Sequence, residues 1–256
     1  MKSQIVVFEG NQEDGIFSKD RKFYKETDTE EEIFNSIKES RTKLGNKYNF
    51  SGLKMIQAIQ KMEDNELYED NKVTIIDDKN LQKDDYFKEK IYSDILIINN
   101  KYKGVALCHR MADCPVLILE DRKEGYTAIV HCSIYHINRG LPKEFIKSMI
   151  KYCHSKPENL YLYIGSHIKK ESYIYESYPS KATNKDIWKD AIIHKEDGYH
   201  IDLSKAILNQ IDEFNLKEIK ISNIDTANTK NYASHYKAFH GDKSKLGQNI
   251  VGFYYK

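Results

Sequence analysis

A thiol and an imidazole stand at the ends of two strand-like runs in the middle of the chain. Cys114, in the segment Arg110-Met111-Ala112-Asp113-Cys114-Pro115, precedes one apolar run, and His131 ends another. If these strands are neighbours, the two side chains meet at one edge of a sheet. They are then either a nucleophile with its base or two ligands of a zinc ion, which in catalytic sites usually has three protein ligands and an open position. On spacing alone, the favoured interpretation is that Cys114 is an ordinary buried thiol and that His131 is a hydrogen-bonded histidine at a strand end.

The segments around this pair read as short strands and amphipathic helices. Runs of β-branched or aliphatic residues predict buried strands, at 73–76, 95–98, 105–107, 116–119, 127–130, 160–164, around Ile219 and Ile221, and at 251–255. Helical spacing of apolar residues predicts helices, at 30–43, at 142–152 after Pro142, and after Asp202 as N-cap, with Ile207, Ile211 and Phe214 in one stripe. The alternation lacks the rhythm of a Rossmann fold, and no glycine-rich phosphate loop is present, which argues against a nucleotide-cofactor fold.

Composition narrows the class of protein further. The 40 Lys and Arg residues nearly balance the 39 Asp and Glu residues, so the net charge of +1 gives no long-range field that favours nucleic acid or an anionic membrane. No apolar run is long enough for a signal peptide or a membrane span. The four cysteines lack the spacing of a disulfide framework and are expected to be reduced, which indicates a cytoplasmic protein. With no linker or repeat, we expect one domain over residues 1–256.

Several blocks, in the same order along the chain, resemble a known family. Met111-Ala112-Asp113-Cys114 with the following Pro-Val-Leu-Ile is similar to its Thr-Ala-Asp-Cys block, and Ile129-Val130-His131-Cys132-Ser133 to its Ala-Val-His-Ala-Gly-Trp block, with an apparent insertion before Arg139-Gly140. Ile164-Gly165-Ser166 resembles its Ile-Gly-Pro block, and Asp202-Leu203 its Asp-Leu helix. The family is the laccase-like one, once described as multicopper polyphenol oxidoreductases, whose members act as zinc-dependent purine nucleoside phosphorylases or adenosine deaminases.

The resemblance implies a fold, a site and a set of ligands. The fold would be a single α/β (α+β) domain with four layers, α/β/β/α, and mixed sheets. Cys114 and His131 would be zinc ligands, and Asp113 would be either a catalytic acid or a structural carboxylate that caps a turn or orients His131. Tyr173 and Ser234 would bind ribose or base, although core packing is the favoured role of Tyr173, and Lys237 would supply a charge for phosphate. The ligands would be a purine nucleoside and phosphate, with neither nucleic acid nor membrane as a partner.

Departures from the family pattern leave other functions open. The first zinc histidine of the family has no counterpart in Gln57-Ala58-Ile59-Gln60. His109 or His136 could substitute in space, but an ordinary polar role is favoured for each because a ligand must also meet the metal geometry. The family's C-terminal arginines are replaced near Tyr236, Lys237 and Gln248. The alternatives are therefore a metal-free cysteine hydrolase, with Cys114 as nucleophile and His131 as base, and an inactive binding protein.

Overall fold

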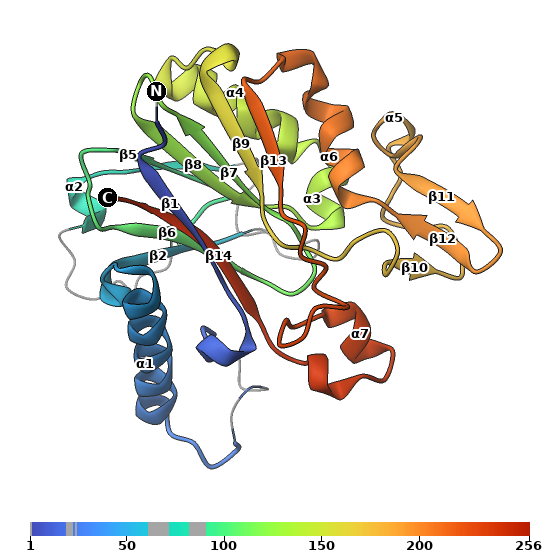
Figure 1. Ribbon diagram of the computed structural model, residues 1–256, viewed down its shortest axis with the longest axis horizontal. Coiled ribbons are helices and arrows are strands. Elements are labelled where there is room, and N and C mark those ends of the chain that lie inside the picture. The colour runs from blue at the N-terminus through green and yellow to red at the C-terminus, as the bar shows by residue number, and fades with distance from the viewer. Residues whose placement is uncertain (1, 19–22, 24, 61–71, 82–90) are drawn as a thin grey trace.

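Two β-sheets pack face to face with helices on both outer sides (Figure 1). The computed structural model describes the chain except for residues 1, 19–22, 24, 61–71 and 82–90. The five-stranded sheet has the order β1 (Ile5–Gly10), β14 (Asn249–Tyr255), β6 (Ala106–Met111), β2 (Met55–Ile59) and β4 (Ile91–Tyr92). The six-stranded sheet has the order β13 (Glu218–Ile221), β9 (Leu160–Ile164), β7 (Val116–Asp121), β8 (Tyr126–His131), β5 (Ile95–Asn99) and β3 (Val73–Ile76).

Both sheets are mixed. In the five-stranded sheet, β2 runs parallel to β4 and β6, whereas β14 is antiparallel to both of its neighbours. In the six-stranded sheet, the outer pairs β13·β9 and β3·β5 are parallel, and the inner strands pair antiparallel. A mixed sheet needs faces covered by other layers wherever its strands are apolar on both sides.

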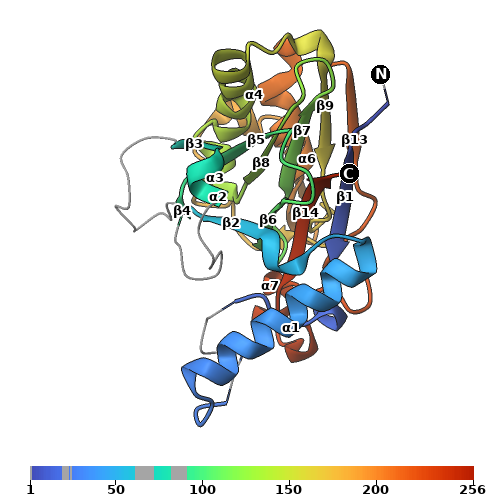
Figure 2. The ribbon, with the colours of Figure 1, turned by 90° about the vertical axis from the view of Figure 1, so that its left-hand side faces the viewer.

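Three apolar cores separate the layers. One core lies between the sheets, where Leu107 and Phe253 of one sheet pack near Ile118 and Ile129 of the other. A second core joins the outer face of the six-stranded sheet to α3 (Ile134–Asn138), α4 (Leu141–Cys153) and α6 (Leu203–Ile211). A third lies on the outer face of the five-stranded sheet, which α1 (Glu30–Tyr48) covers through Leu44 (Figure 2). The predicted α/β/β/α arrangement with mixed sheets is therefore confirmed.

Local sequence explains where the two long helices begin and end. At the start of α1, the Thr29 hydroxyl accepts from the Glu32 N–H while the Glu32 carboxylate accepts from the Thr29 N–H, and the helix ends at Asn49 with φ of 61°, a left-handed conformation that asparagine tolerates. The helix predicted at 30–43 therefore runs one turn further. At α4, Gly140 precedes the first turn, which contains Pro142, a residue whose fixed φ suits that position.

The remaining elements are short. A three-stranded sheet of β10 (Ile174–Tyr175), β12 (Gly198–Ile201) and β11 (Ile192–Lys195) projects at one side. Short helices are α2 (Asp78–Leu81), α5 (Lys185–Trp188) and α7 (His235–Phe239). Five 3-10 turns complete the described part, at Gln12–Asp14, Gly52–Lys54, Pro157–Asn159, Asp212–Phe214 and Lys243–Lys245. None of the described helices is long and apolar enough to cross a membrane.

Candidate active site

The strand order brings Cys114 and His131 to the same edge of the six-stranded sheet. His131, the last residue of β8, is paired with Val116, the first residue of β7, and the Cys132 N–H donates to the Pro115 carbonyl at 2.9 Å. Strand β9 ends at this edge too, because the Gly165 N–H donates to the Val116 carbonyl at 2.9 Å. The predicted strands are therefore neighbours: β7 begins just after Cys114, and β8 ends at His131. The separation of the sulfur from the imidazole stays a prediction.

His131 is held by the side chain of Gln60, the residue just after β2. His131 Nδ1 lies 2.8 Å from Gln60 Oε1, and Gln60 Nε2 donates to the His131 carbonyl at 2.8 Å. Because the amide oxygen can only accept, Nδ1 carries the proton and Nε2 keeps its lone pair. Burial, followed by the neighbouring His136 and His109, holds the pKa of His131 well below 6.5. The imidazole is therefore neutral at physiological pH.

Two more imidazoles stand beside His131. The ring centroids of His109 and His131 are 6.2 Å apart, and those of His131 and His136 are 5.9 Å apart. His136 Nδ1 lies 2.8 Å from the Ser133 hydroxyl. His109 is buried, its pKa is lowered to about 3 mainly by burial, and its Nε2 has no hydrogen-bond partner among the described residues. A buried polar atom without a partner is uncommon in proteins and marks a place for water or a ligand.

Cys114 is a protonated thiol in this environment. It is half-buried, and burial together with the nearby Asp113 carboxylate raises the pKa of its thiol to about 12. The nucleophilic and metal-binding form of cysteine is the thiolate. Cys114 therefore reacts as a nucleophile, or binds a metal, only if it loses its proton during that event.

The carboxylate of Asp113 is engaged in holding another part of the chain. Its Oδ1 accepts from the Thr226 hydroxyl at 2.7 Å, and its Oδ2 accepts from the Tyr236 N–H at 2.7 Å. The residue is buried with φ of 89°, which is unusual for a residue other than glycine but tolerated best by Asn and Asp. Burial raises the pKa of Asp113. These contacts join the β6–β7 loop to the start of α7.

The other residues predicted for the site are in part gathered around Asp113. Ser234 is fully buried, caps α7 by accepting from the Lys237 N–H at 3.2 Å, and also bonds to Asp113. Tyr173 is half-buried, with its ring 5.4 Å from that of Tyr236. Burial, then Tyr175, and to a smaller extent Cys114 and Asp113 raise the pKa of its hydroxyl. Lys237 is half-buried on α7, and no side-chain contact joins it to Asp113 among the described residues. The structure thus brings together Asp113, Cys114, Tyr173 and Ser234.

The described residues do not provide three protein ligands for a zinc ion. No three His, Cys, Asp or Glu side chains in the described ranges gather closely enough to hold a metal ion. Gln60, from the block where a family histidine is missing, contacts Nδ1 of His131. His109 retains an unpartnered nitrogen, but its ring is not part of a three-ligand set in this conformation.

His167, which lies near the same edge, was not predicted from the sequence. His167 is buried beyond the end of β9, where Nδ1 lies 2.7 Å from the Gly165 carbonyl and Nε2 lies 2.6 Å from the Ser204 hydroxyl. Burial is the main cause that lowers its pKa to about 4. Ser204 lies on α6, 37 residues away, so no local pattern could indicate this contact.

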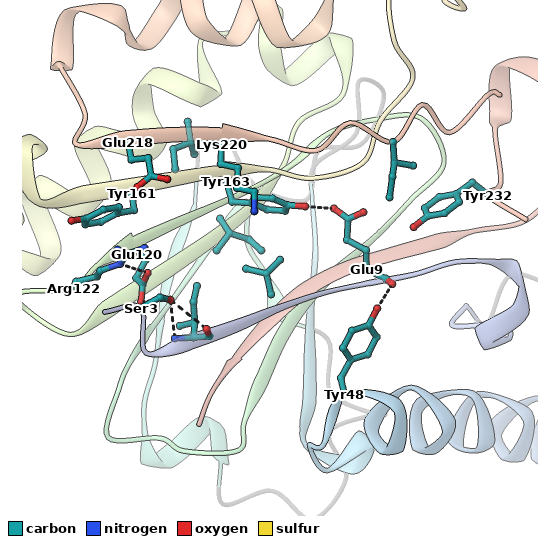
Figure 3. Close-up of a pocket in the computed structure, with 15 residues that line it drawn as sticks. Ser3, Glu9, Tyr48, Glu120, Arg122, Tyr161, Tyr163, Glu218, Lys220 and Tyr232 are labelled. Atoms are coloured by element: carbon teal, nitrogen blue, oxygen red, sulfur yellow. Dashed lines mark hydrogen bonds and ion pairs between the residues drawn. The ribbon is translucent and has the colours of Figure 1, made fainter. Parts of the chain in front are cut away.

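A pocket of about 470 Å³ lies away from these residues, between β1 and the strands β9 and β13 (Figure 3). None of the site residues predicted from the sequence lines it. It holds Glu9, Tyr48 and Tyr232 at one end, and Arg122 and Glu120 at the other. The pocket is therefore separate from the edge that carries Cys114 and His131.

Comparison with known proteins agrees with this architecture. The family model described as multi-copper polyphenol oxidoreductase laccase matches residues 35–252. The fold is similar to that of YfiH from Bacillus licheniformis, described as a hypothetical protein, with a TM-score of 0.68 and 15% identity over 87% of this chain and 82% of that one. It is also similar to YlmD from Geobacillus stearothermophilus (TM-score 0.69, 15% identity, 87% and 81% covered).

A third solved structure, protein NMB0706 from Neisseria meningitidis, has a TM-score of 0.64 and 11% identity, with 87% and 82% covered. At these identities the likeness to solved structures concerns the fold alone. No curated protein sequence matches the chain. The family model, which spans most of the sequence, shows that the chain belongs to the multi-copper polyphenol oxidoreductase laccase family.

Proposed function

We propose that this protein acts on purine nucleosides, by deamination or phosphorolysis, at the sheet edge that carries Cys114 and His131, and that its turnover is low. Family membership supports the substrate class, because the resemblance of the sequence blocks is to nucleoside-processing members. The observation that carries the proposal is the pair of hydrogen bonds from Gln60, which leave a neutral His131 with a free Nε2 lone pair beside the strand that begins after Cys114.

That lone pair suits a reaction in which water attacks the base. In deamination, the water oxygen bonds to C6 of adenine and its proton passes to His131 Nε2. The C6–N bond then breaks, and ammonia leaves with that proton. Because burial keeps the pKa of His131 well below 6.5, the imidazole is in the accepting form but is a weak base. Low turnover follows.

Asp113 fits a positioning role better than the role of an acid. Both of its oxygens already accept hydrogen bonds, from Thr226 and from the backbone of Tyr236. A carboxylate held in this way orients the β6–β7 loop, on which Cys114 stands. Tyr173 and Ser234 stay candidates for contacts to the nucleoside, although the hydroxyl of Ser234 is already used as a cap. Lys237 stays the candidate cation for phosphate.

Zinc is the metal that the family resemblance implies, with Cys114 and His131 as its ligands. Two ligands without a third give weak binding, because affinity depends on the number and geometry of the donors. We therefore propose zinc as a weakly held cofactor and assign no step of the reaction to it. The reduced state of all four cysteines accords with the cytoplasm as the proposed location.

A cysteine hydrolase is the second candidate. The Gln60 amide orients His131, as a third group orients the base in nucleophilic catalysis. Irreversible alkylation of Cys114 by a substrate-like electrophile would support this function. The raised pKa of the Cys114 thiol disfavours a resting thiolate. We therefore prefer nucleoside chemistry to cysteine hydrolysis as the proposed function.

The proposal is tested by adenosine turnover of the pure protein. We expect slow conversion that Cys114→Ala and His131→Ala each abolish, while His194→Ala, an exposed histidine on β11, leaves it unchanged. Circular dichroism checks that the variants fold. Turnover that persists in folded His131→Ala would refute the assignment of this edge, and no turnover by the wild type with excess zinc would favour an inactive binding protein.

A further inference from the structure

The pocket between the open edges of the two sheets has apolar walls and two chemically different ends. Its apolar walls include Ile5 and Val7 of one sheet and Ile118 of the other, together with Ile224 from the segment after β13. Figure 3 places Glu9, Tyr48 and Tyr232 towards one end and Arg122, Glu120, Tyr161 and Glu218 towards the other. Tyr163 and the cation Lys220 lie between the two ends, with the Tyr163 hydroxyl directed at Glu9. A volume of about 470 Å³ falls within the range of small-molecule sites.

At the arginine end, which Glu218 also lines, Arg122 and Glu120 form an ion pair. Arg122 Nε lies 2.8 Å from Glu120 Oε2, and the guanidinium carbon lies 3.4 Å from the centroid of the Tyr161 ring. The other oxygen of Glu120 accepts from the Ser3 hydroxyl at 3.1 Å and from the Gln4 N–H at 2.9 Å. Arg122 and Glu120 therefore have their partners without a ligand.

At the opposite end one carboxylate oxygen has no donor. Glu9 Oε1 accepts from the Tyr163 hydroxyl at 2.7 Å and from the Ser166 N–H at 3.0 Å. Glu9 Oε2 is shielded from solvent and has no hydrogen-bond partner among the described residues. Leaving a buried carboxylate oxygen without a donor is unfavourable, since the group loses water and gains nothing in return.

Aromatic rings surround this carboxylate. The Tyr48 hydroxyl donates to the Glu9 carbonyl at 2.8 Å, Tyr163 bonds to its carboxylate, and Tyr232 lies at the same end (Figure 3). Burial, and then the charge of Glu9, raise the pKa of both Tyr163 and Tyr232, so the phenols stay neutral. Neutral aromatic rings beside a carboxylate attract organic cations, through the ring faces and through the charge.

We propose that this pocket is a second binding site, for a small protonated amine whose ammonium group donates to Glu9 and whose apolar body lies against the pocket walls. At the Glu9 end an anion would be repelled by the carboxylate, whose Oε2 has no donor among the described residues. A quaternary ammonium could not donate the hydrogen bond that Oε2 lacks. The site does not rest on the nucleoside proposal, because Cys114 and His131 are not among its lining residues.

Isothermal titration with phenethylamine tests the site, with 2-phenylethanol as a neutral ligand of similar shape. We expect the amine to bind about tenfold more tightly than the alcohol or better, since a charge-assisted bond is stronger than a neutral one. Glu9→Gln should abolish that preference while retaining an acceptor for Tyr163. Glu124→Gln, the same change of charge in an exposed turn, should leave the preference intact.

A second measurement locates the ligand without a variant. Methyl NMR of the wild-type protein should show shifts on adding phenethylamine that are concentrated at Ile5, Val7, Ile118 and Ile224. Equal affinity for amine and alcohol would overturn the proposal, and so would shifts at other methyl groups only. Unchanged preference in Glu9→Gln would overturn it as well.

Discussion

Gln60 determines which nitrogen of His131 is available, and so what the site can do. Its carbonyl oxygen accepts from Nδ1 and its amide nitrogen donates to the backbone carbonyl of the same residue. The two bonds fix the orientation of the amide and the tautomer of the ring together. A histidine in the block that holds Gln60 would instead offer a third nitrogen to a metal ion beside Cys114 and His131.

Gln60→His should add a third zinc ligand beside His131. We expect the wild-type protein to lose zinc to a competing chelating dye, and Gln60→His to hold about one zinc per chain with affinity raised about tenfold or more, because a third ligand completes a catalytic type of site. Gln57→His is the matched control, since the Gln57 side chain bonds to Cys108 and not to His131. Wild-type protein that keeps one zinc through extensive chelation would contradict this and would indicate His109 as the third ligand.

At the scale of elements, the β6–β7 loop is fixed by its contact with the start of α7. Asp113 supplies that contact through two hydrogen bonds, and its left-handed backbone turns the chain from β6 of one sheet to β7 of the other. The Ile168 N–H donates to the Asp113 carbonyl at 3.0 Å, which attaches the segment after β9 as well. Cys114 is thus held where three segments meet.

Asp113→Asn tests whether this residue positions the loop. The amide tolerates the backbone conformation and can still accept from Thr226, but its NH₂ group then faces the Tyr236 N–H. We expect the free energy of unfolding in urea to fall by about 1–3 kcal/mol, with turnover per folded molecule reduced in part. Stability equal to the wild type, together with complete loss of turnover, would instead assign Asp113 as the acid.

The sequence predicted those elements whose apolar pattern is strong. The runs at 73–76 and 160–164 are β3 and β9 with the same bounds, and the helix at 142–152 is α4 with one more residue at each end. Edge strand β1 was not predicted, because the run Ile5-Val6-Val7-Phe8 has no alternation and its partner, β14, lies at the other end of the chain. Strand β2 was not predicted either.

In the candidate site too, features with a local sequence pattern were predicted and long-range contacts were not. The neighbouring ends of β7 and β8 could be predicted from local patterns and from the resemblance. The contact of Gln60 with His131 joins residues 71 apart, and that of Glu9 with Tyr163 joins residues 154 apart. Such pairs form only when the sheets stack, so a single sequence carries no local signal for them.

For the whole molecule, neutral buried histidines make stability depend on pH. His109, His131 and His167 have folded pKa values far below the ordinary 6.5, so below that pH the unfolded chain binds protons that the folded chain does not. Stability then rises with pH and is lost as pH falls through about 6.5. With one proton per histidine, the loss between about pH 7.5 and 5.5 should be about 4 kcal/mol.

Urea unfolding across this range measures the effect. His167→Gln should reduce the slope of stability against pH by about one third, whatever it does to stability itself, because one of the three titrating groups is removed. His194→Ala, at an exposed position, should leave the slope unchanged. A stability that stays constant between the two pH values would show that these histidines are protonated in the folded protein.

The product formed from adenosine as the phosphate concentration is varied distinguishes deamination from phosphorolysis. In the family that the sequence resembles, C-terminal arginines would hold phosphate, and they are replaced here; each lost charge-assisted contact would then weaken phosphate binding by about 1.5–3 kcal/mol. We therefore expect inosine and ammonia to form slowly, with at most a slight response to phosphate. Rapid release of adenine, or of hypoxanthine from inosine, that rises with phosphate concentration would contradict this and would show that another cation, such as Lys237, holds the anion.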